Sequence, residues 1–474
     1  GLAYVALLIY TIIKILLDTD STPKTLAYIL MVITIPLIGI IIYFSFGINY
    51  RHKMISKKGW QAKKIIGKEY NALVEDNLES ILKSNESDFQ QYDELARFIH
   101  KIGGDHVGKN EVELLINGEE KFPEVLKMLK TAKNFIHMEY YDWENDVRGN
   151  QIKEILLDKV KEGVKVRVMY DDYASKGIKR NIVKELKKGG VEIYPVIKVN
   201  IVAFANRMNH RDHRKVIIID GHVGFVGGIN ISDRYDNSID TGLYWRDTHV
   251  KITGTTTLSL LRHWLVNWNI CQPDFLSFDR NLVPDLDEII SSANSKPILT
   301  QIIAGGPVYR MSNIMLTYFR IFTLARKKLY ITNPYFIPSE SIMDALKQAA
   351  VSGVDVRLMV PKKSDSGIVG ASAKFYYHDL LYAGVKIFEY RKGFVHAKTV
   401  VADDCISVVG TANMDIRSFD LNFEIFSVTY NTEFANKLEE VYLDDLKECD
   451  EILLEEWDKQ GDFQNLKYAL ARLS

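Results

Sequence analysis

The chain has 474 residues, of which 47% are apolar, enough for a sizeable core in two or three domains. Its formal net charge of −1 provides no overall basic field, which argues against nucleic acid as a partner. Its three cysteines, Cys271, Cys405 and Cys449, are too scattered to form a metal-binding cluster or a disulfide framework.

Two apolar segments lie at the start of the chain. Residues 26–46 contain no charged side chain over 21 positions and predict a transmembrane helix, because such a helix rises about 30 Å. Residues 1–17 are apolar except for Lys14. Since the chain begins at Gly1 rather than methionine, this segment is interpreted as the end of a truncated first transmembrane helix. The alternatives are a buried core helix for the longer segment and a signal-like segment for the shorter one.

The segment after residue 46 is strongly basic. Residues 47–68 contain no Asp or Glu, and their basic residues are Arg51, Lys53, Lys57, Lys58, Lys63, Lys64 and Lys68. Short basic loops beside a membrane span stay in the cytoplasm, so the rest of the chain is expected there. The same charges would attract anionic lipid headgroups. Residues 47–118 are expected to form this basic flank and a helical connector.

The remaining chain repeats one α/β pattern, in residues 119–295 and again in residues 296–474. A strand-like run near Phe135 or Tyr330 is followed by a helical pattern that ends at Gly163 or Gly353. A β-branched strand comes next, and a second helix and strand follow it. Strands that alternate with helices in this way predict parallel βαβ units.

Two arrays of polar residues recur with the same spacing, one in each half. The first contains His213, Lys215, Asp220, Gly228 and Asn230, and the second contains His396, Lys398, Asp403, Thr411 and Asn413. The histidine and the asparagine are 17 residues apart in both arrays. A single His-x-Lys would carry no information, but two matching arrays predict one site that is built from two half-sites.

These residue types suit an anionic phosphodiester. The lysines can balance its charge and that of the transition state, and the asparagines can donate hydrogen bonds to its oxygens. Small residues at Gly228 and Thr411 would let backbone N–H groups approach the phosphate. One histidine can attack phosphorus, and the other can protonate the leaving oxygen.

Four carboxylates belong to this predicted site. A nucleophilic histidine needs a fixed tautomer, and Asp247 and Glu424 are the candidates to set it. They stand 34 and 28 residues beyond the histidines of their own halves, and each is expected beside that histidine. Asp220 and Asp403 complete the catalytic motif, but they stand where one strand turns into the next, which favours a structural role over a chemical one.

The duplicated His-x-Lys-x4-Asp motif resembles the hallmark of the phospholipase D superfamily, over about residues 120–474. Within it, residues 395–418 and the following Leu-Asn-Phe-Glu look like bacterial cardiolipin synthase. The apolar N-terminal hairpin and the lead-in Asn209-His-Arg-Asp-His-Arg-Lys are also similar to that family. The resemblance implies an α/β fold of two tandem phospholipase D-like repeats, packed as a pseudo-symmetric pair and preceded by a transmembrane helical hairpin.

The resemblance also implies a reaction. Members of this family condense two phosphatidylglycerol molecules into cardiolipin and glycerol, with His213 as the nucleophile and His396 as the acid and base. No metal or other cofactor is needed, because the lysines supply the charge. The expected location is the bacterial inner membrane, with several spans and a cytoplasmic catalytic domain that meets anionic lipid. The order in which the histidines act, and whether the chain forms a homo-oligomer, stay open.

Several functions remain to be weighed against this one: a hydrolase or another phosphatidyltransferase of the same superfamily, and a non-catalytic membrane scaffold. Residues 199–206 are apolar and could dip toward lipid, and so could the helical runs at residues 258–268 and 311–324, for which core packing is at least as good an interpretation. Four aromatic residues at strand ends are candidates to line a lipid path: Tyr140, Tyr141, Tyr335 and Phe336. The histidines outside the two arrays are interpreted as packing or surface residues.

Overall fold

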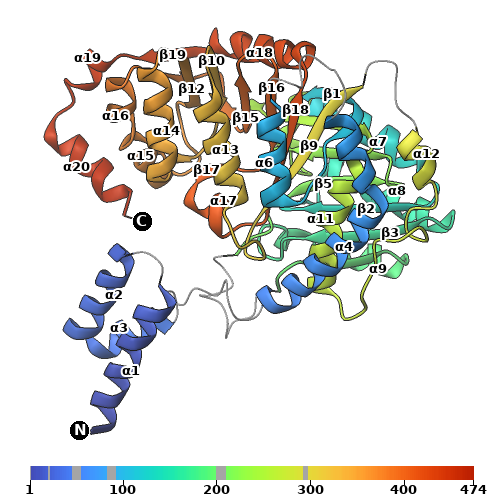
Figure 1. Ribbon diagram of the computed structural model, residues 1–474, viewed down its shortest axis with the longest axis horizontal. Helices are drawn as coiled ribbons and strands as arrows, with labels where there is room; N and C mark the ends of the chain where they lie inside the picture. Colours follow the sequence, from blue (N-terminus) through green and yellow to red (C-terminus); the bar gives the residue numbers. More distant parts are fainter. Residues whose placement is uncertain are drawn as a thin grey trace.

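The computed structural model describes residues 2–19, 22–44, 55–82, 92–198, 210–291 and 297–473. Figure 1 shows an α/β body, together with three N-terminal helices that stand apart from it. The body is built on one sheet of 15 strands, in the order β19-β13-β12-β10-β15-β16-β18-β9-β1-β8-β6-β5-β2-β3-β4.

The first half of the sheet contains the predicted parallel units. Its strands are β1 (Gly108–Ile116), β2 (Phe135–Tyr140), β3 (Lys165–Tyr170), β4 (Glu192–Pro195), β5 (Lys215–Ile219), β6 (Val223–Gly227) and β8 (Thr248–Gly254). Strand β2 pairs in parallel with β3, and β3 with β4, across the helices α8 (Val147–Lys161) and α9 (Ile182–Lys188). Strands β5 and β6 are antiparallel, as expected for a strand that returns after a short turn.

The second half repeats this arrangement. Its strands are β9 (Ile298–Gly305), β10 (Lys328–Thr332), β12 (Asp355–Pro361), β13 (Lys386–Tyr390), β15 (Thr399–Ala402), β16 (Ile406–Gly410), β18 (Glu424–Tyr430) and β19 (Cys449–Ile452). Strand β10 is parallel to β12, and β12 to β13, across α14 (Glu340–Val351) and α16 (Tyr377–Tyr382). The expected pair of tandem α/β halves is therefore present.

The two halves join in the middle of the sheet, where β1 is antiparallel to β9. Strand β1 lies in the segment that was expected to be a helical connector. That segment is helical in α4 (Ile55–Leu82) and α6 (Asp93–Gly103), but Gly108–Ile116 is a strand because it pairs with β8 on one side and β9 on the other. The connector thus contributes a central strand to the sheet.

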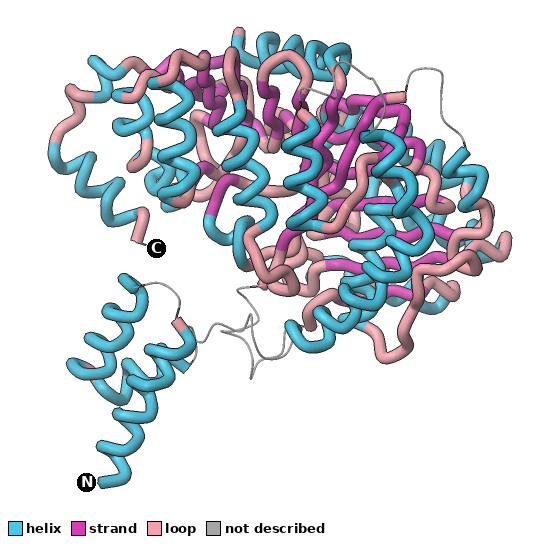
Figure 2. Tube along the Cα trace, in the orientation of Figure 1, coloured by secondary structure: helices cyan, strands magenta, loops and turns pink. Residues whose placement is uncertain are grey.

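Helices cover both faces of the sheet, as Figure 2 shows, and enclose three buried clusters. The cluster of the first half lies under α7 (Asn117–Thr131), α8 and α9. That of the second half lies under α6, α13 (Asn313–Leu324), α14 and α16. The third involves strands of both halves, together with α4, α11 (Thr257–Cys271) and α18 (Thr432–Leu446), and so packs the halves as one body.

The N-terminal helices are α1 (Leu2–Asp18), α2 (Thr22–Thr34) and α3 (Pro36–Ile42). The single helix expected over residues 26–46 is broken at Ile35, and residues 45 and 46 lie outside the described part. Proline has no N–H and disfavours helical geometry in the preceding residue, and Ile35 accordingly adopts φ −133° and ψ 70°. Within the described residues, no helix combines the length and apolarity needed to cross a membrane.

Candidate active site

Short parallel pairings between the two halves position the two histidines. His396 follows β14 (Phe394–Val395), which pairs with β7 (Trp245–Arg246) of the first half. The backbone N–H of His396 donates to the carbonyl of Arg246 at 2.7 Å. In the same way, the backbone N–H of His213 donates to the carbonyl of Phe423 in the second half at 3.0 Å. Each histidine is therefore held beside the segment that precedes the other half's carboxylate.

This exchange decides which carboxylate meets which histidine. Nδ1 of His213 lies 2.9 Å from Oε1 and 3.0 Å from Oε2 of Glu424, and Nδ1 of His396 lies 2.7 Å from Oδ2 of Asp247. The two carboxylates do orient the histidines, but the expected pairing within each half is wrong. The spacing along the chain could not show this, because the contact depends on the parallel pairings between the halves.

The ionisation of both pairs is consistent with neutral imidazoles beside charged carboxylates. Burial lowers the pKa of His396 to about 3, and Lys398 lowers it further while Asp247 opposes the shift. Burial also lowers the pKa of His213 against the opposing charge of Glu424. Since an ionised carboxylate only accepts hydrogen bonds, each Nδ1 carries the proton and each Nε2 keeps a free lone pair.

Both carboxylates are held in the charged form. Burial raises the pKa of Asp247, but His396, Lys398 and the backbone N–H of Thr248 outweigh it and bring the value to about 2. Burial likewise raises the pKa of Glu424, while His213, Lys215 and Thr411 bring it below its usual range. Each pair is thus prepared to fix one tautomer of its histidine.

Lys215 and Lys398 are buried, and neither forms an ion pair within the described residues. Each ammonium donates to the carbonyl of the histidine two residues before it. Burial lowers the pKa of Lys215 to about 8 and that of Lys398 to about 7. Lys215 affects the pKa of His396, and Lys398 that of His213, so the two half-sites share one electrostatic environment.

Gly228 and Thr411 contact the carboxylates, which differs from the expected phosphate contact. A Cβ atom on Gly228 would lie 2.1 Å from Oδ1 of Asp247, so only glycine leaves room for that side chain. The Thr411 hydroxyl donates to Oε2 of Glu424 at 2.5 Å. In each half, the residue at this position therefore places the carboxylate that orients a histidine.

The two asparagines occupy different environments. Nδ2 of Asn230 donates to the Tyr235 hydroxyl at 2.6 Å, and its Oδ1 accepts from the backbone of Asp142 at 3.3 Å. Asn413 is 6% exposed, and its Oδ1 has no hydrogen-bond partner among the described residues. Asn413 is therefore the less constrained of the two predicted phosphate ligands.

Asp220 and Asp403 end the strands that begin beside the histidines, and both have positive φ, +52° and +51°. The Asp220 carboxylate accepts backbone hydrogen bonds from Lys133, Asn134 and Phe135 at 2.7–2.8 Å. Asp403 accepts equivalent bonds from residues 326–328. Both carboxylates bind the start of a neighbouring strand at the far end from the histidines, so the structural interpretation is the better of the two.

Two residues of the site have no counterpart in the predicted set. Tyr235 and Ser418 each stand five residues beyond the asparagine of their array. Tyr235 binds Asn230, and the Ser418 hydroxyl donates to Oε1 of Glu424 at 2.9 Å. Their residue types differ, so comparing the two arrays by type does not reveal either position.

Aromatic rings surround the two imidazoles. The Tyr141 ring packs edge-on against His213, with ring centroids 4.7 Å apart, and Trp245 packs against His396 at 5.5 Å. Tyr335 is also close to His396, at 6.3 Å, whereas Tyr140 and Phe336 are buried in the core. Of the four aromatic candidates, Tyr141 and Tyr335 therefore lie at the site.

The other predicted lipid contacts have different outcomes. Helix α11 is buried on all sides over residues 257–269, so core packing is correct for it. The apolar segment 199–206 lies outside the described residues. His137 stacks on Trp264 at 4.0 Å, and His263 binds Asp105 at 2.9 Å, so both are packing residues. Among the described residues, no group of three His, Cys, Asp or Glu side chains could hold a metal ion.

Two imidazoles with free Nε2 atoms, two buried lysines and a duplicated α/β half match the two half-sites expected from the sequence. This arrangement can transfer a phosphoryl-linked group through one histidine while the other moves protons. The class of protein is therefore that of the phospholipase D-like enzymes.

Comparisons with known proteins identify the family. A family model described as "Cardiolipin synthase, PLD-like domain" matches residues 125–254 and 318–446, and one for the phospholipase D-nuclease N-terminal region matches residues 6–47. Cardiolipin synthase 2 of Bacillus anthracis is 37% identical over 94% of this chain and 85% of its own length. The major cardiolipin synthase ClsA of Bacillus subtilis is 33% identical over 100% and 97%.

This chain therefore belongs to the cardiolipin synthase family of the phospholipase D superfamily, and it is a phosphatidyltransferase. Among solved structures, phosphatidylserine synthase of Haemophilus influenzae has a similar fold, with a TM-score of 0.57 and 15% identity over 81% of this chain and 98% of that one. At that identity the likeness concerns the fold alone.

Proposed function

We propose that this enzyme joins two phosphatidylglycerol molecules into cardiolipin and glycerol, through a phosphatidyl-histidine intermediate. The observation that carries the mechanism is that each histidine binds the carboxylate of the other half through Nδ1. The unprotonated Nε2 of each ring is therefore available for the reaction. Both imidazoles lie in the field of Lys215 and Lys398, as one shared phosphate requires.

In the first step, Nε2 of His213 attacks phosphorus, and the bond from phosphorus to the glycerol headgroup breaks. His396 gives a proton to the leaving glycerol oxygen. In the second step, His396 takes a proton from the terminal hydroxyl of a second phosphatidylglycerol. That oxygen attacks phosphorus, and the N–P bond to His213 breaks. One phosphodiester replaces another, so the reaction is near energy balance and needs no nucleotide.

His396 must carry an additional proton when the first bond breaks. Burial lowers its pKa to about 3, which favours the neutral ring before substrate binds. A bound phosphodiester adds negative charge beside the ring and raises that pKa, because an anion favours the protonated imidazole. Substrate binding thus creates the acid that the reaction uses, while the lysines balance the remaining negative charge.

The apolar N-terminal segment supports a bacterial inner-membrane location, with the catalytic body on the cytoplasmic side. A family model matches residues 6–47, and the basic residues beyond them follow the pattern of a cytoplasmic flank. Removing residues 1–50 should reduce activity on bilayers more than activity on micellar substrate. Equal losses on both would show that this segment does more than anchor the body.

A product assay tests the proposed reaction. The purified full chain is incubated with phosphatidylglycerol, and the lipid products are resolved. We expect cardiolipin together with an equal amount of glycerol, whereas a hydrolase of the same superfamily would yield mainly phosphatidic acid. His213→Ala should abolish turnover, and unchanged turnover in that variant would exclude the mechanism.

A further inference from the structure

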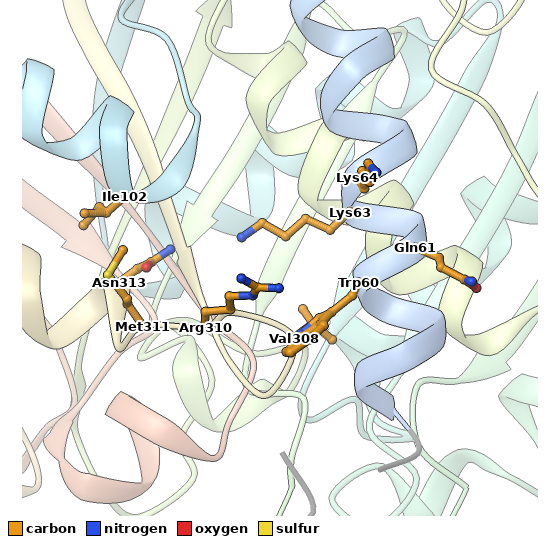
Figure 3. A pocket seen from close by; sticks show the side chains of 9 residues that line it. All are labelled: Trp60, Gln61, Lys63, Lys64, Ile102, Val308, Arg310, Met311 and Asn313. Atoms are coloured by element: carbon orange, nitrogen blue, oxygen red, sulfur yellow. The ribbon is translucent and has the colours of Figure 1, made fainter. Parts of the chain in front are cut away.

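A cavity of about 570 Å³ opens outside the catalytic centre, between α4 and the loop that joins β9 to α13. It is lined by Trp60, Gln61, Lys63, Lys64, Ile102, Val308, Arg310, Met311 and Asn313. Figure 3 shows the side chains of Lys63 and Arg310 extending into it from opposite walls, so that their charged ends lie near each other. None of the lining residues belongs to the two catalytic arrays.

Two cations lie close together in the cavity. Within the described residues, neither Lys63 nor Arg310 forms an ion pair, and their charged groups instead lie over the rings of Tyr309 and Trp60 at 4.2 and 4.8 Å. Asp105 is a carboxylate near Lys63, but it already accepts from Arg262 and His263 at 2.9 Å. Lys63 is half-buried and Arg310 is exposed, and like charges this close repel each other, which favours a bound anion.

Burial lowers the pKa of Lys63 to about 8, Arg262 and Arg310 lower it further, and Asp105 opposes the shift only in part. A bound phosphate group would offset the repulsion between the two cations, because a phosphodiester offers acceptor oxygens to both side chains.

The rest of the cavity is apolar. Trp60, Ile102, Val308 and Met311 supply hydrocarbon surface beside the two cations, and Met311 is 46% exposed at its edge. Gly59 allows the helix to approach this wall closely, since a Cβ atom there would lie 2.4 Å from Val308. A charged group next to apolar walls fits an amphiphile better than a small soluble anion.

Helix α4 also follows the apolar N-terminal segment along the chain, and the opposite wall belongs to a loop that begins beside the catalytic centre. Gly305, the last residue of β9, pairs with Glu424 in the sheet. Tyr309, under Lys63, binds His263 at 2.7 Å, and Arg214, which follows His213, donates to the carbonyl of His263 at 3.2 Å. An occupant of the cavity would therefore lie near the catalytic centre, against a helix that follows the apolar N-terminal segment in the chain.

We propose that this cavity is a second lipid site, in which Lys63 and Arg310 bind the phosphate of an anionic glycerophospholipid and Trp60 and Met311 contact its acyl chains. This lipid is separate from the substrate held by the histidines. The inference concerns binding alone, so it does not depend on the reaction proposed above.

Quenching of Trp60 fluorescence by lipids with brominated acyl chains tests this site. The full-length His213→Ala protein is used in nonionic detergent micelles, so that no lipid is consumed, and Trp60→Phe isolates the Trp60 signal from the other tryptophans. We expect saturable quenching by brominated phosphatidylglycerol, and much weaker quenching by brominated phosphatidylcholine with the same chains. Equal quenching by both lipids would overturn the assignment of an anionic headgroup.

Variants that remove the charge of Lys63 or Arg310 test whether these two side chains bind the lipid. Lys63→Met and Arg310→Gln should each raise the half-saturating concentration of phosphatidylglycerol by about fivefold, and the double variant by about 30-fold. Lys68→Met is the matched control, because Lys68 is an exposed lysine on the same helix that does not line the cavity, and it should change binding by less than about twofold. Unchanged binding in the double variant would overturn the proposal.

Two further measurements separate the remaining explanations. Inorganic phosphate should not compete with the lipid at equal concentration; if it does, the site binds a soluble anion and the lipid assignment is wrong. Lys63→Met should raise the melting temperature of the lipid-free protein, because it removes a poorly compensated charge. A lower melting temperature with unchanged quenching would show that Lys63 is structural.

Discussion

Asp247 of the first half accepts a hydrogen bond from His396 of the second half at 2.7 Å, and Glu424 of the second half binds His213 of the first. Neither half can therefore orient its own histidine. The parallel pairing of Phe394 with Trp245 brings one of these pairs together, and that of Asp212 with Phe423 brings the other. The catalytic unit is the assembled pair of halves.

This exchange predicts which step each carboxylate supports. A phosphatidyl ester of p-nitrophenol has a leaving group that needs no acid, so its release reports attack by His213 alone. Glu424→Gln should slow the burst of p-nitrophenol by roughly 10²–10⁴-fold, while Asp247→Asn should leave the burst nearly intact and slow the later turnover. If Asp247→Asn slowed the burst and Glu424→Gln slowed only the later turnover, the result would support pairing within each half. Asp450→Asn, at a surface carboxylate, is the control.

Thr411 should matter through Glu424. Thr411→Val removes the hydroxyl that donates to Oε2 at 2.5 Å, so the pKa of Glu424 should rise and its hold on His213 should weaken. We expect turnover to fall by about 10–100-fold, the effect of removing one hydrogen bond to a buried charged group. Thr429→Val removes a buried hydroxyl from β18, the strand that begins at Glu424, and should leave turnover unchanged. Similar losses in both variants would point to general damage to the packing around β18.

Asp220 should matter for stability rather than chemistry. Asp220→Asn keeps a residue that tolerates positive φ but weakens the bonds to three backbone N–H groups. The free energy of unfolding should fall by about 1–3 kcal/mol, and kcat of the folded protein should stay within about twofold. Denaturant titration and initial rates measure these two quantities. A folded variant with a greatly reduced kcat would return Asp220 to the catalytic set.

The lysines predict the alkaline limb of the pH profile. Burial lowers the pKa of Lys398 to about 7 and that of Lys215 to about 8, so each ammonium is lost as the pH rises through these values. Only the charged forms can balance the phosphodiester, and kcat/KM, which reports the free enzyme, should therefore decline above about pH 7. Lys398→Arg keeps its charge and should move the limb upward by about one pH unit. An unmoved limb would show that another group controls it.

Much of the fold was predictable because the two halves of the chain repeat the same order and spacing of residues. The parallel units and the antiparallel return after each His-x-Lys could be found from matching offsets in the chain. The two orienting carboxylates stand at unequal offsets, 34 and 28 residues, and were found because a nucleophilic histidine needs a carboxylate. Strand β1 could not, because its position depends on pairing with β8 and β9 on either side. Pro36 can be read in the sequence, but transmembrane helices tolerate proline. Its presence alone therefore did not predict that the helix breaks at Ile35.

The pairing at the centre of the site was not predictable from the offsets. Two histidines and two carboxylates at similar spacings can combine within the halves or between them, and only the contacts between the halves decide. The same holds for Gly228 and Thr411. Small residues beside a phosphate and small residues beside a carboxylate look alike in a sequence, whereas the 2.1 Å approach of a Cβ atom at Gly228 to Asp247 separates them.

Trapping the covalent intermediate tests the central claim most directly. In His396→Ala, the p-nitrophenyl substrate can still load the enzyme, but no base remains to activate the acceptor. We predict a phosphatidyl group that accumulates on residue 213, is stable to alkali and labile to acid, and is located by mass spectrometry of the digested protein. A label on any other residue, or a fully active variant with no label, would contradict the shared two-histidine site.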